Sequence, residues 1–178
     1  MKKYILLTLL IFILGMSFTV SSMGSVETPQ AEILLALAGN LFLFAPYPWW
    51  IYLSNRIVSK ARGIEPPSRI NYLALYTLVA FWAGFGGAGG FLLNSNIQES
   101  HPIAEGIFML SLISGFGALI IGAILVSGRV IDAENSPEAG RKSRIFVLVL
   151  GYLYIPIGMF FIAKRLERIA QANASASH

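Results

Sequence analysis

The stretch GIFMLSLISGFGALIIGAILVSG, residues 106–128, contains no charged residue and no histidine. An α-helix rises about 1.5 Å per residue, so roughly 20 apolar residues cross the roughly 30 Å hydrocarbon core of a bilayer. Residues 72–97 and 145–163 are also free of Asp, Glu, Lys, Arg and His. Runs of this length and composition predict α-helices that cross a membrane.

The composition of the whole chain supports the same class. Of its 178 residues, 56% are hydrophobic and 12% are charged, whereas a soluble domain carries about 25% charged residues. The net charge of +4 comes from basic residues that flank the apolar runs, which is typical of loops facing anionic lipid rather than of a nucleic-acid partner. The absence of cysteine excludes disulfides and thiolate metal sites. We therefore predict an all-α integral membrane protein.

The predicted architecture is a bundle of four transmembrane helices within residues 25–163. The four spans are expected at about 31–54, 72–94, 103–128 and 145–163. Before them, residues 1–24 have two lysines, an apolar stretch and small polar residues, which is the layout of a cleaved signal peptide or of an uncleaved anchor that forms a fifth helix. Both alternatives place residue 25 outside. Residues 164–178 form a polar basic tail.

The distribution of Lys and Arg orients the bundle in a cell membrane. Segments 55–71 and 129–144 each hold four basic residues, and segment 95–102 holds none. The positive-inside rule places the two basic segments in the cytoplasm. With four or five complete crossings the tail then lies outside, although it carries Lys164, Arg165 and Arg168. The tail is therefore the one part of the chain that conflicts with this topology.

Small residues indicate how the second and third spans pack. Five glycines lie between positions 84 and 90, and the third span carries small residues at a matching helical spacing. In lipid, helices associate through close van der Waals contact, which small side chains allow. The residues expected in this contact are Gly84, Gly86, Gly87 and Gly90 on one span, and Ser114, Ala118 and Gly122 on the other. A glycine-lined pore, a hinge or a flat cofactor is the functional alternative.

Prolines predict irregularities in two other spans. Pro46 and Pro48 remove backbone donors within the first span, so we expect a kink near Ala45. Pro156 predicts a bend in the last span. The aromatic residues that follow Pro48 are typical of a membrane–water interface.

One loop gathers groups that are capable of acid–base or metal chemistry. Glu99, His101 and Glu105 lie on or beside the predicted outer loop, and the last two are four residues apart. That spacing on a helix would place both side chains on one face, where they could hold a divalent cation or relay protons. Alternatively, Glu105 lies in the first turn of a helix and complements its dipole. No metal or cofactor is assigned on this pattern alone.

Three function classes follow from these patterns. The first is a small non-catalytic accessory or structural subunit that packs against lipids and against other integral membrane subunits or itself. The second is an oligomeric channel or carrier for a small neutral solute, because a neutral permeant needs no charged site. The third is a membrane enzyme or cofactor subunit that uses Glu99, His101 and Glu105. The predicted spans place no ionisable residue beyond a first helical turn, which favours the first class over pumps and proton-coupled transporters.

Overall fold

The computed structural model describes residues 1–22, 29–89, 102–134 and 140–176, and the regular elements within these ranges are all helical. In chain order they are α1 (Lys2–Ser22), α2 (Pro29–Phe44), α3 (Pro46–Ala61), α4 (Ser68–Phe81), the π-helix η1 (Trp82–Ala88), α6 (Pro102–Ala133), α7 (Arg141–Leu153) and α8 (Ile155–Ala176). Among these residues, three helical stretches are long and apolar enough to cross a membrane: Lys2–Ser21, Leu34–Ala61 and Pro102–Ala133.

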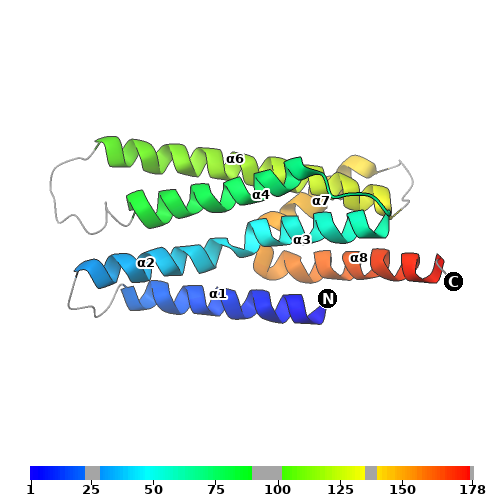
Figure 1. Cartoon of the computed structure of the whole chain (residues 1–178), viewed down its shortest axis with the longest axis horizontal. Coiled ribbons are helices and arrows are strands. Elements are labelled where there is room, and N and C mark those ends of the chain that lie inside the picture. The colour runs from blue at the N-terminus through cyan, green and yellow to red at the C-terminus, as the bar shows by residue number, and fades with distance from the viewer. Residues whose placement is uncertain (23–28, 90–101, 135–139, 177–178) are drawn as a thin grey trace.

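The helices lie roughly along one axis and form an elongated bundle (Figure 1). Helices α1 and α2 run antiparallel, α3 continues in the direction of α2, and α4 and α6 lie side by side. Helices α3, α6 and α8 end toward one end of the bundle, and α4 and α7 begin there (Figure 1). We call this the basic end, because it contains the residues Arg62, Arg69, Arg141 and Lys142.

The helical hydrogen bonding is interrupted between α2 and α3 by two prolines, although Ala45 keeps helical dihedral angles (φ −56°, ψ −35°). Pro46 and Pro48 have no N–H and so cannot donate to the carbonyls four residues earlier. The neighbouring bonds remain: the Ala45 N–H donates to the Leu41 carbonyl (2.9 Å), and the Trp49 N–H donates to the Ala45 carbonyl (3.2 Å). Helix α2 therefore ends at Phe44 and α3 begins at Pro46.

The apolar run 145–163, expected to form a single span, instead forms two helices. Helix α7 ends at Leu153, Tyr154 leaves the helical region (φ −113°, ψ 56°), and α8 begins at Ile155. The chain reverses at this point and α8 returns to the basic end (Figure 1). At 13 residues, α7 is about 20 Å long, which is too short to cross a bilayer.

Gly158 allows the α7–α8 hairpin to close. A Cβ at Gly158 would lie within 2.5 Å of the Gly151 Cα and carbonyl carbon. Real Cβ atoms do not approach backbone atoms this closely, so the position accepts only glycine. The tip of the hairpin, Leu153 and Tyr154, lies beside Phe116 and Ile120 near the middle of α6.

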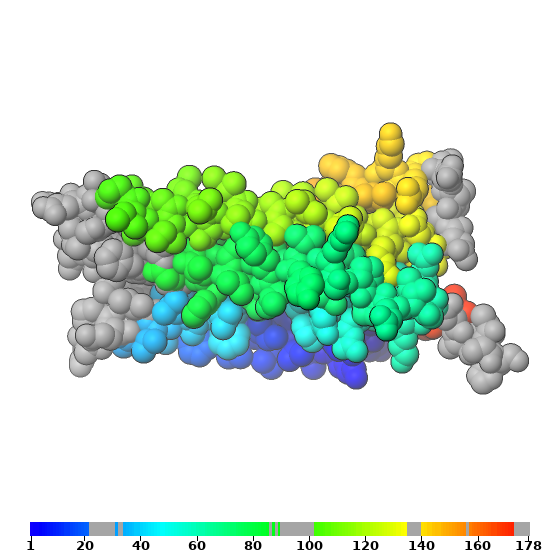
Figure 2. All heavy atoms as spheres, turned by 45° about the horizontal axis from the view of Figure 1, so that its top comes forward, coloured from blue at the N-terminus to red at the C-terminus, as the bar shows by residue number. Residues whose placement is uncertain are grey.

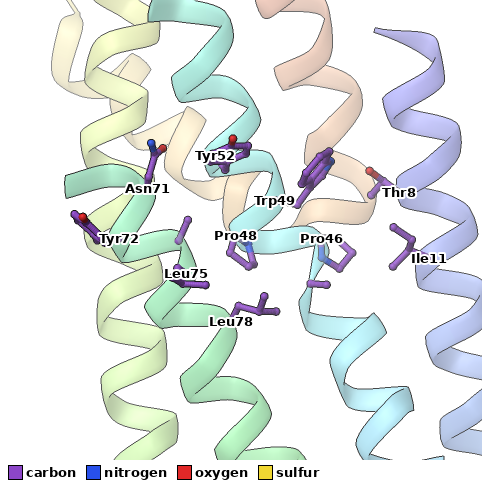
Figure 3. Close-up of a pocket in the computed structure, with 12 residues that line it drawn as sticks. Thr8, Ile11, Pro46, Pro48, Trp49, Tyr52, Asn71, Tyr72, Leu75 and Leu78 are labelled. Carbon is purple, nitrogen blue, oxygen red and sulfur yellow. The ribbon is translucent and has the colours of Figure 1, made fainter. Parts of the chain in front are cut away.

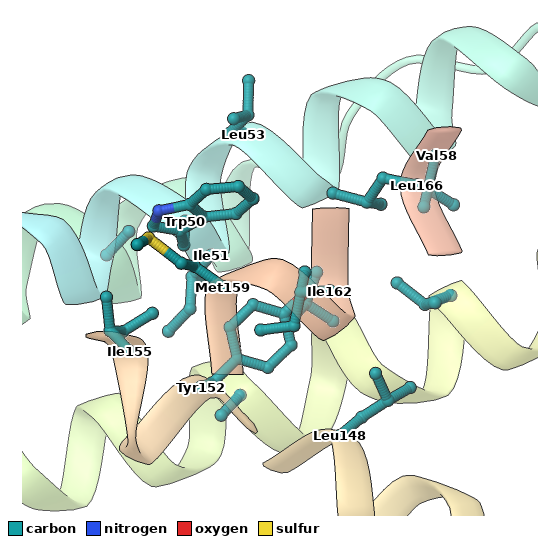
Figure 4. Close-up of a cluster of buried hydrophobic side chains, with 14 of the residues drawn as sticks. Trp50, Ile51, Leu53, Val58, Leu148, Tyr152, Ile155, Met159, Ile162 and Leu166 are labelled. Carbon is teal, nitrogen blue, oxygen red and sulfur yellow. The ribbon is translucent and has the colours of Figure 1, made fainter. Parts of the chain in front are cut away.

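The main core lies between α3, α6, α7 and α8, and α4 adds buried residues to it. Trp50, Tyr152 and Met159 are fully buried there, and Met159 lies beside Trp50 (Figure 4). The core continues along α8, where Leu166 and Ile169 are buried. The segment expected as a polar tail is therefore helical to Ala176 and packs one apolar face on the bundle.

The glycine-rich segment contacts α6 only at some positions. A Cβ at Gly84 would lie 2.9 Å from the Ser111 Cβ, and one at Gly115 would lie 3.0 Å from the Phe81 ring. Gly122 faces Ile51, and Ala118 is buried. Gly87, in contrast, faces open space.

The remaining small residues expected at this contact are placed as follows. The backbone of Gly86 lies in η1, and Gly90 lies outside the described residues. The Ser114 hydroxyl donates to the Ser111 carbonyl (3.3 Å) within its own helix.

Large apolar side chains cover the outside of the long helices. Figure 2 shows the face on which α4 and α6 extend along the molecule. On α6, exposed apolar residues continue from Ile103 to Leu125. On α1 they continue from Leu6 to Val20. Soluble monomers rarely expose contiguous apolar patches of this extent.

Candidate functional site

A polar cluster joins three helices at the basic end. It consists of Asn55 and Ser59 on α3, Asn71 on α4 and Arg129 on α6. The Arg129 guanidinium donates through Nη1 to the Asn55 Oδ1 and through Nη2 to the Ser59 Oγ (2.9 Å). The Asn55 Nδ2 donates to the Asn71 Oδ1 (3.0 Å) and to the Pro67 carbonyl (3.3 Å).

Helical spacing explains how these groups meet. Asn55 and Ser59 are four residues apart and so lie on one face of α3, where they are 0% and 1% exposed. Helix α6 continues to Ala133, which places Arg129 within the helix and directs its side chain toward α3. A single guanidinium can donate to two acceptors on adjacent helical turns because its donors form a planar fork.

The polar cluster carries a net positive charge, that of Arg129. Within the described residues, the partners of Arg129 are neutral and no carboxylate lies within 4.0 Å of its guanidinium. A partly buried charge needs hydrogen-bond acceptors to replace its hydration. Asn55 and Ser59 supply these acceptors, so the polar cluster links α6 to α3 and, through Asn71, to α4.

The assignment of 129–144 to a connecting loop missed this polar cluster. In the structure Arg129 is helical, and its neighbours on the other helices are more than 50 residues away in sequence. The one available signal was the pair of polar residues at Asn55 and Ser59, where the sequence was interpreted as the end of a span and the start of a loop.

An apolar groove opens between α1, the start of α3 and α4 (Figure 3). We call it the lateral groove; its volume is about 460 Å³, within the range of about 300–1,000 Å³ that is typical of ligand pockets. It is lined by Thr8, Ile11, Ala45, Pro46, Pro48, Trp49, Tyr52, Asn71, Tyr72, Ala74, Leu75 and Leu78.

Local sequence features shape the lateral groove. The break at Ala45 presents the rings of Pro46 and Pro48 instead of longer side chains. On the α1 side, the Thr8 hydroxyl accepts a hydrogen bond from the Trp50 Nε1 (2.9 Å), which fixes α1 against α3. Asn71 lines the groove and also belongs to the polar cluster, so the two features adjoin.

The lateral groove continues into an exposed ridge on α4. Tyr72, Leu75 and Val79 on α4 and Trp82 at the start of η1 follow a 3-4-3 spacing, and their exposed fractions are 69%, 58%, 52% and 49%. We call these four residues the α4 seam. This spacing is that of the a and d positions at which one helix packs against another.

Of the three candidate residues at the predicted outer loop, the structure describes only Glu105. Glu99 and His101 lie outside the described residues. Glu105 is exposed in the first turn of α6, at the end of the molecule opposite to Arg129. The described ranges contain no group of three His, Cys, Asp or Glu side chains that could hold a metal ion.

Comparisons with known proteins do not assign the chain to a family. No protein-family model matches the chain, and comparisons with curated proteins and with solved structures also find no match.

Proposed function

We propose that this chain is a multi-pass cell-membrane protein whose basic end lies in the cytoplasm. The observation that carries the proposal is that all thirteen Lys and Arg residues belong to the segments near the basic end. They are Lys2, Lys3, Arg56, Lys60, Arg62, Arg69, Arg129, Arg141, Lys142, Arg144, Lys164, Arg165 and Arg168. An excess of Lys and Arg on one side is the main determinant of cytoplasmic orientation.

The α7–α8 hairpin removes the conflict that the basic tail creates for a chain with only complete crossings. A hairpin that enters the bilayer and returns brings α8 back beside the end of α6. The Arg165 Nη1 lies 3.0 Å from the Glu134 Oε2, which supports this placement. We infer that residues 164–176 are cytoplasmic together with the connections after α3 and α6.

We predict that Lys142 at the start of α7 and Glu167 on α8 lie on the same side of the membrane. The chain has no native cysteine, so single cysteines can be placed at Lys142, Glu167 and Glu105. In intact cells, a membrane-impermeant maleimide should label Glu105→Cys and leave Lys142→Cys and Glu167→Cys unlabelled until the cells are opened. Labelling of Glu167→Cys together with Glu105→Cys would contradict the hairpin and favour a complete fourth crossing.

We also propose that α1 remains in the mature protein as an anchor. A Cβ at Gly39 would lie 2.9 Å from the Thr19 N, and one at Gly15 would lie 2.8 Å from the Leu43 N, so α1 and α2 are in backbone contact. Together with the Thr8–Trp50 hydrogen bond, this contact supports α1 as part of the bundle rather than as a removed segment.

Within the membrane, we propose the role of a non-catalytic accessory subunit that receives a transmembrane helix of another subunit in the lateral groove. The groove opens sideways, it is almost entirely apolar, and the α4 seam extends from it with helix-packing periodicity. Aromatic residues such as Tyr72 and Trp82 are enriched at the centres of protein interfaces. A partner helix would bury the α4 seam along its length, whereas a single acyl chain would fill only the groove.

Enlarging a side chain in the lateral groove should release the partner. We predict that Leu75→Trp lowers the affinity for the partner by at least about tenfold, equivalent to about 1.4 kcal/mol. The matched control is Ile113→Trp on α6, because Ile113 is similarly exposed but lies outside the groove. Native mass spectrometry after gentle solubilisation measures the complex.

Two outcomes would contradict the accessory-subunit proposal. One is a wild-type chain that is released only as a 19.4 kDa monomer carrying lipid. The other is a complex that Leu75→Trp leaves intact.

A further inference from the structure

A second cavity lies at the basic end, apart from the lateral groove. Its volume is about 440 Å³, and it is lined by Ala133, Glu134, Arg144, Arg165, Arg168, Ile169 and Ala172. These residues come from the end of α6 and the residue after it, the start of α7, and α8 from Arg165 onward. We call it the arginine cavity.

The lining of the arginine cavity has a net positive charge. Three guanidinium groups face one carboxylate, that of Glu134. Glu134 is paired with Arg165, whose guanidinium also lies over the Phe161 ring at 4.7 Å. This pairing holds Arg165 in place, and among the described residues the lining carries three arginines and one carboxylate, a net formal charge of +2.

The chemistry of this lining favours a phosphate group. Arginine binds phosphate oxygens through two parallel N–H donors, so several arginines around one cavity suit a multidentate anion. Arg165 and Arg168 are three residues apart on α8 and therefore project from neighbouring positions on one face. Arg144 approaches the same cavity from α7.

The apolar part of the lining suggests what carries the phosphate. Ala133, Ile169 and Ala172 lie beside the guanidinium groups, so the ligand meets apolar and cationic surfaces together. We propose that the arginine cavity binds a phosphate group, supplied either by the headgroup of an anionic phospholipid or by a soluble phosphate. This inference is independent of the partner in the lateral groove.

The experiment compares two pairs of substitutions that remove the same charge from the same helices. Arg144→Gln with Arg168→Gln removes two cavity arginines. Lys142→Gln with Lys164→Gln is the matched control, because both lysines are exposed and neither lines the cavity. The full-length chain in detergent is titrated with palmitoyl-oleoyl phosphatidylglycerol and with the corresponding phosphatidylcholine, and bound lipid is counted by native mass spectrometry.

The cavity pair should weaken phosphatidylglycerol binding at least about tenfold, and the lysine pair by less than about twofold. Arg144→Lys with Arg168→Lys should give an intermediate loss, because lysine keeps the charge but lacks the fork of donors. Equal losses in the cavity and lysine pairs, or no loss in the cavity pair, would overturn the proposal. Circular dichroism and gel filtration check that each variant is folded.

Competition identifies the source of the phosphate. If millimolar inorganic phosphate displaces phosphatidylglycerol from the wild-type chain, the cavity takes free phosphate. If it does not, and the cavity pair still abolishes selectivity for phosphatidylglycerol over phosphatidylcholine, the ligand is a lipid headgroup. A wild-type chain that binds neither inorganic phosphate nor phosphatidylglycerol in preference to phosphatidylcholine contradicts the site.

Discussion

Replacing Asn55 by leucine should lower the free energy of unfolding by about 1.5–3 kcal/mol, the range for losing a hydrogen bond to a charged group. Asn55 is 0% exposed and accepts a bond from Arg129 while donating to Asn71. Its removal leaves the guanidinium with Ser59 and leaves the Asn71 Oδ1 without its donor. Unfolding in mixed detergent and dodecyl sulfate, followed by circular dichroism, measures the change.

A double-mutant cycle separates this effect from simple loss of packing. Arg129→Leu removes the guanidinium that donates to the Asn55 Oδ1. The free energy of unfolding of the Asn55→Leu/Arg129→Leu chain should therefore fall by at least about 1 kcal/mol less than the sum of the two single losses. Ser59→Ala deletes the weaker acceptor and should cost only about 1 kcal/mol. Strict additivity of the first two substitutions would show that the polar cluster does not act as a unit.

Composition and charge distribution were sufficient to predict the helical class and three long apolar helical stretches, since both depend on properties of contiguous sequence. Within the part of the chain that the structure describes, the expected spans 72–94 and 145–163 are not among these stretches. Helix α6 is the clearest case, because its uncharged run is long enough to cross a bilayer by itself. Its end was less predictable. The sequence predicts a connection that begins at Arg129, since a charged residue after an apolar run is the usual boundary signal. In the structure its acceptors on α3 allow the helix to continue to Ala133.

The lateral groove was beyond prediction for a different reason. Thr8, Pro46 and Leu75 are far apart in sequence, and only the packing of three helices brings them to one surface. The prolines did indicate an interruption near Ala45, but not which helix lies beside it. Predicting the groove would require the relative positions of α1 and α4, and hydrophobic periodicity alone does not contain that information.

The α7–α8 hairpin shows how an apolar run of spanning length can be misinterpreted. Residues 145–163 are uncharged and long enough for a single crossing, so length and hydropathy cannot distinguish one helix from two. The distinguishing features are local: the helix is interrupted at Tyr154, Pro156 lacks a backbone donor, and Gly158 lets the two helices meet in backbone contact. The basic residues that follow, Lys164, Arg165 and Arg168, are the ones that conflict with a complete crossing by this run.

Replacing Gly158 by valine should therefore be among the most damaging single substitutions, with a loss of more than about 3 kcal/mol in the free energy of unfolding. The new Cβ would collide with the backbone of Gly151, which cannot move unless the hairpin opens. Opening would withdraw Met159 and Leu166 from the core and separate Arg165 from Glu134.

The matched control is Gly117→Val on α6, where a Cβ would meet nothing within 4 Å. The same unfolding titration, with limited proteolysis at the α8 end, should show a large loss for Gly158→Val and a change of less than about 1 kcal/mol for Gly117→Val. Equal stability of the two variants would mean that α7 and α8 are not in backbone contact at these glycines.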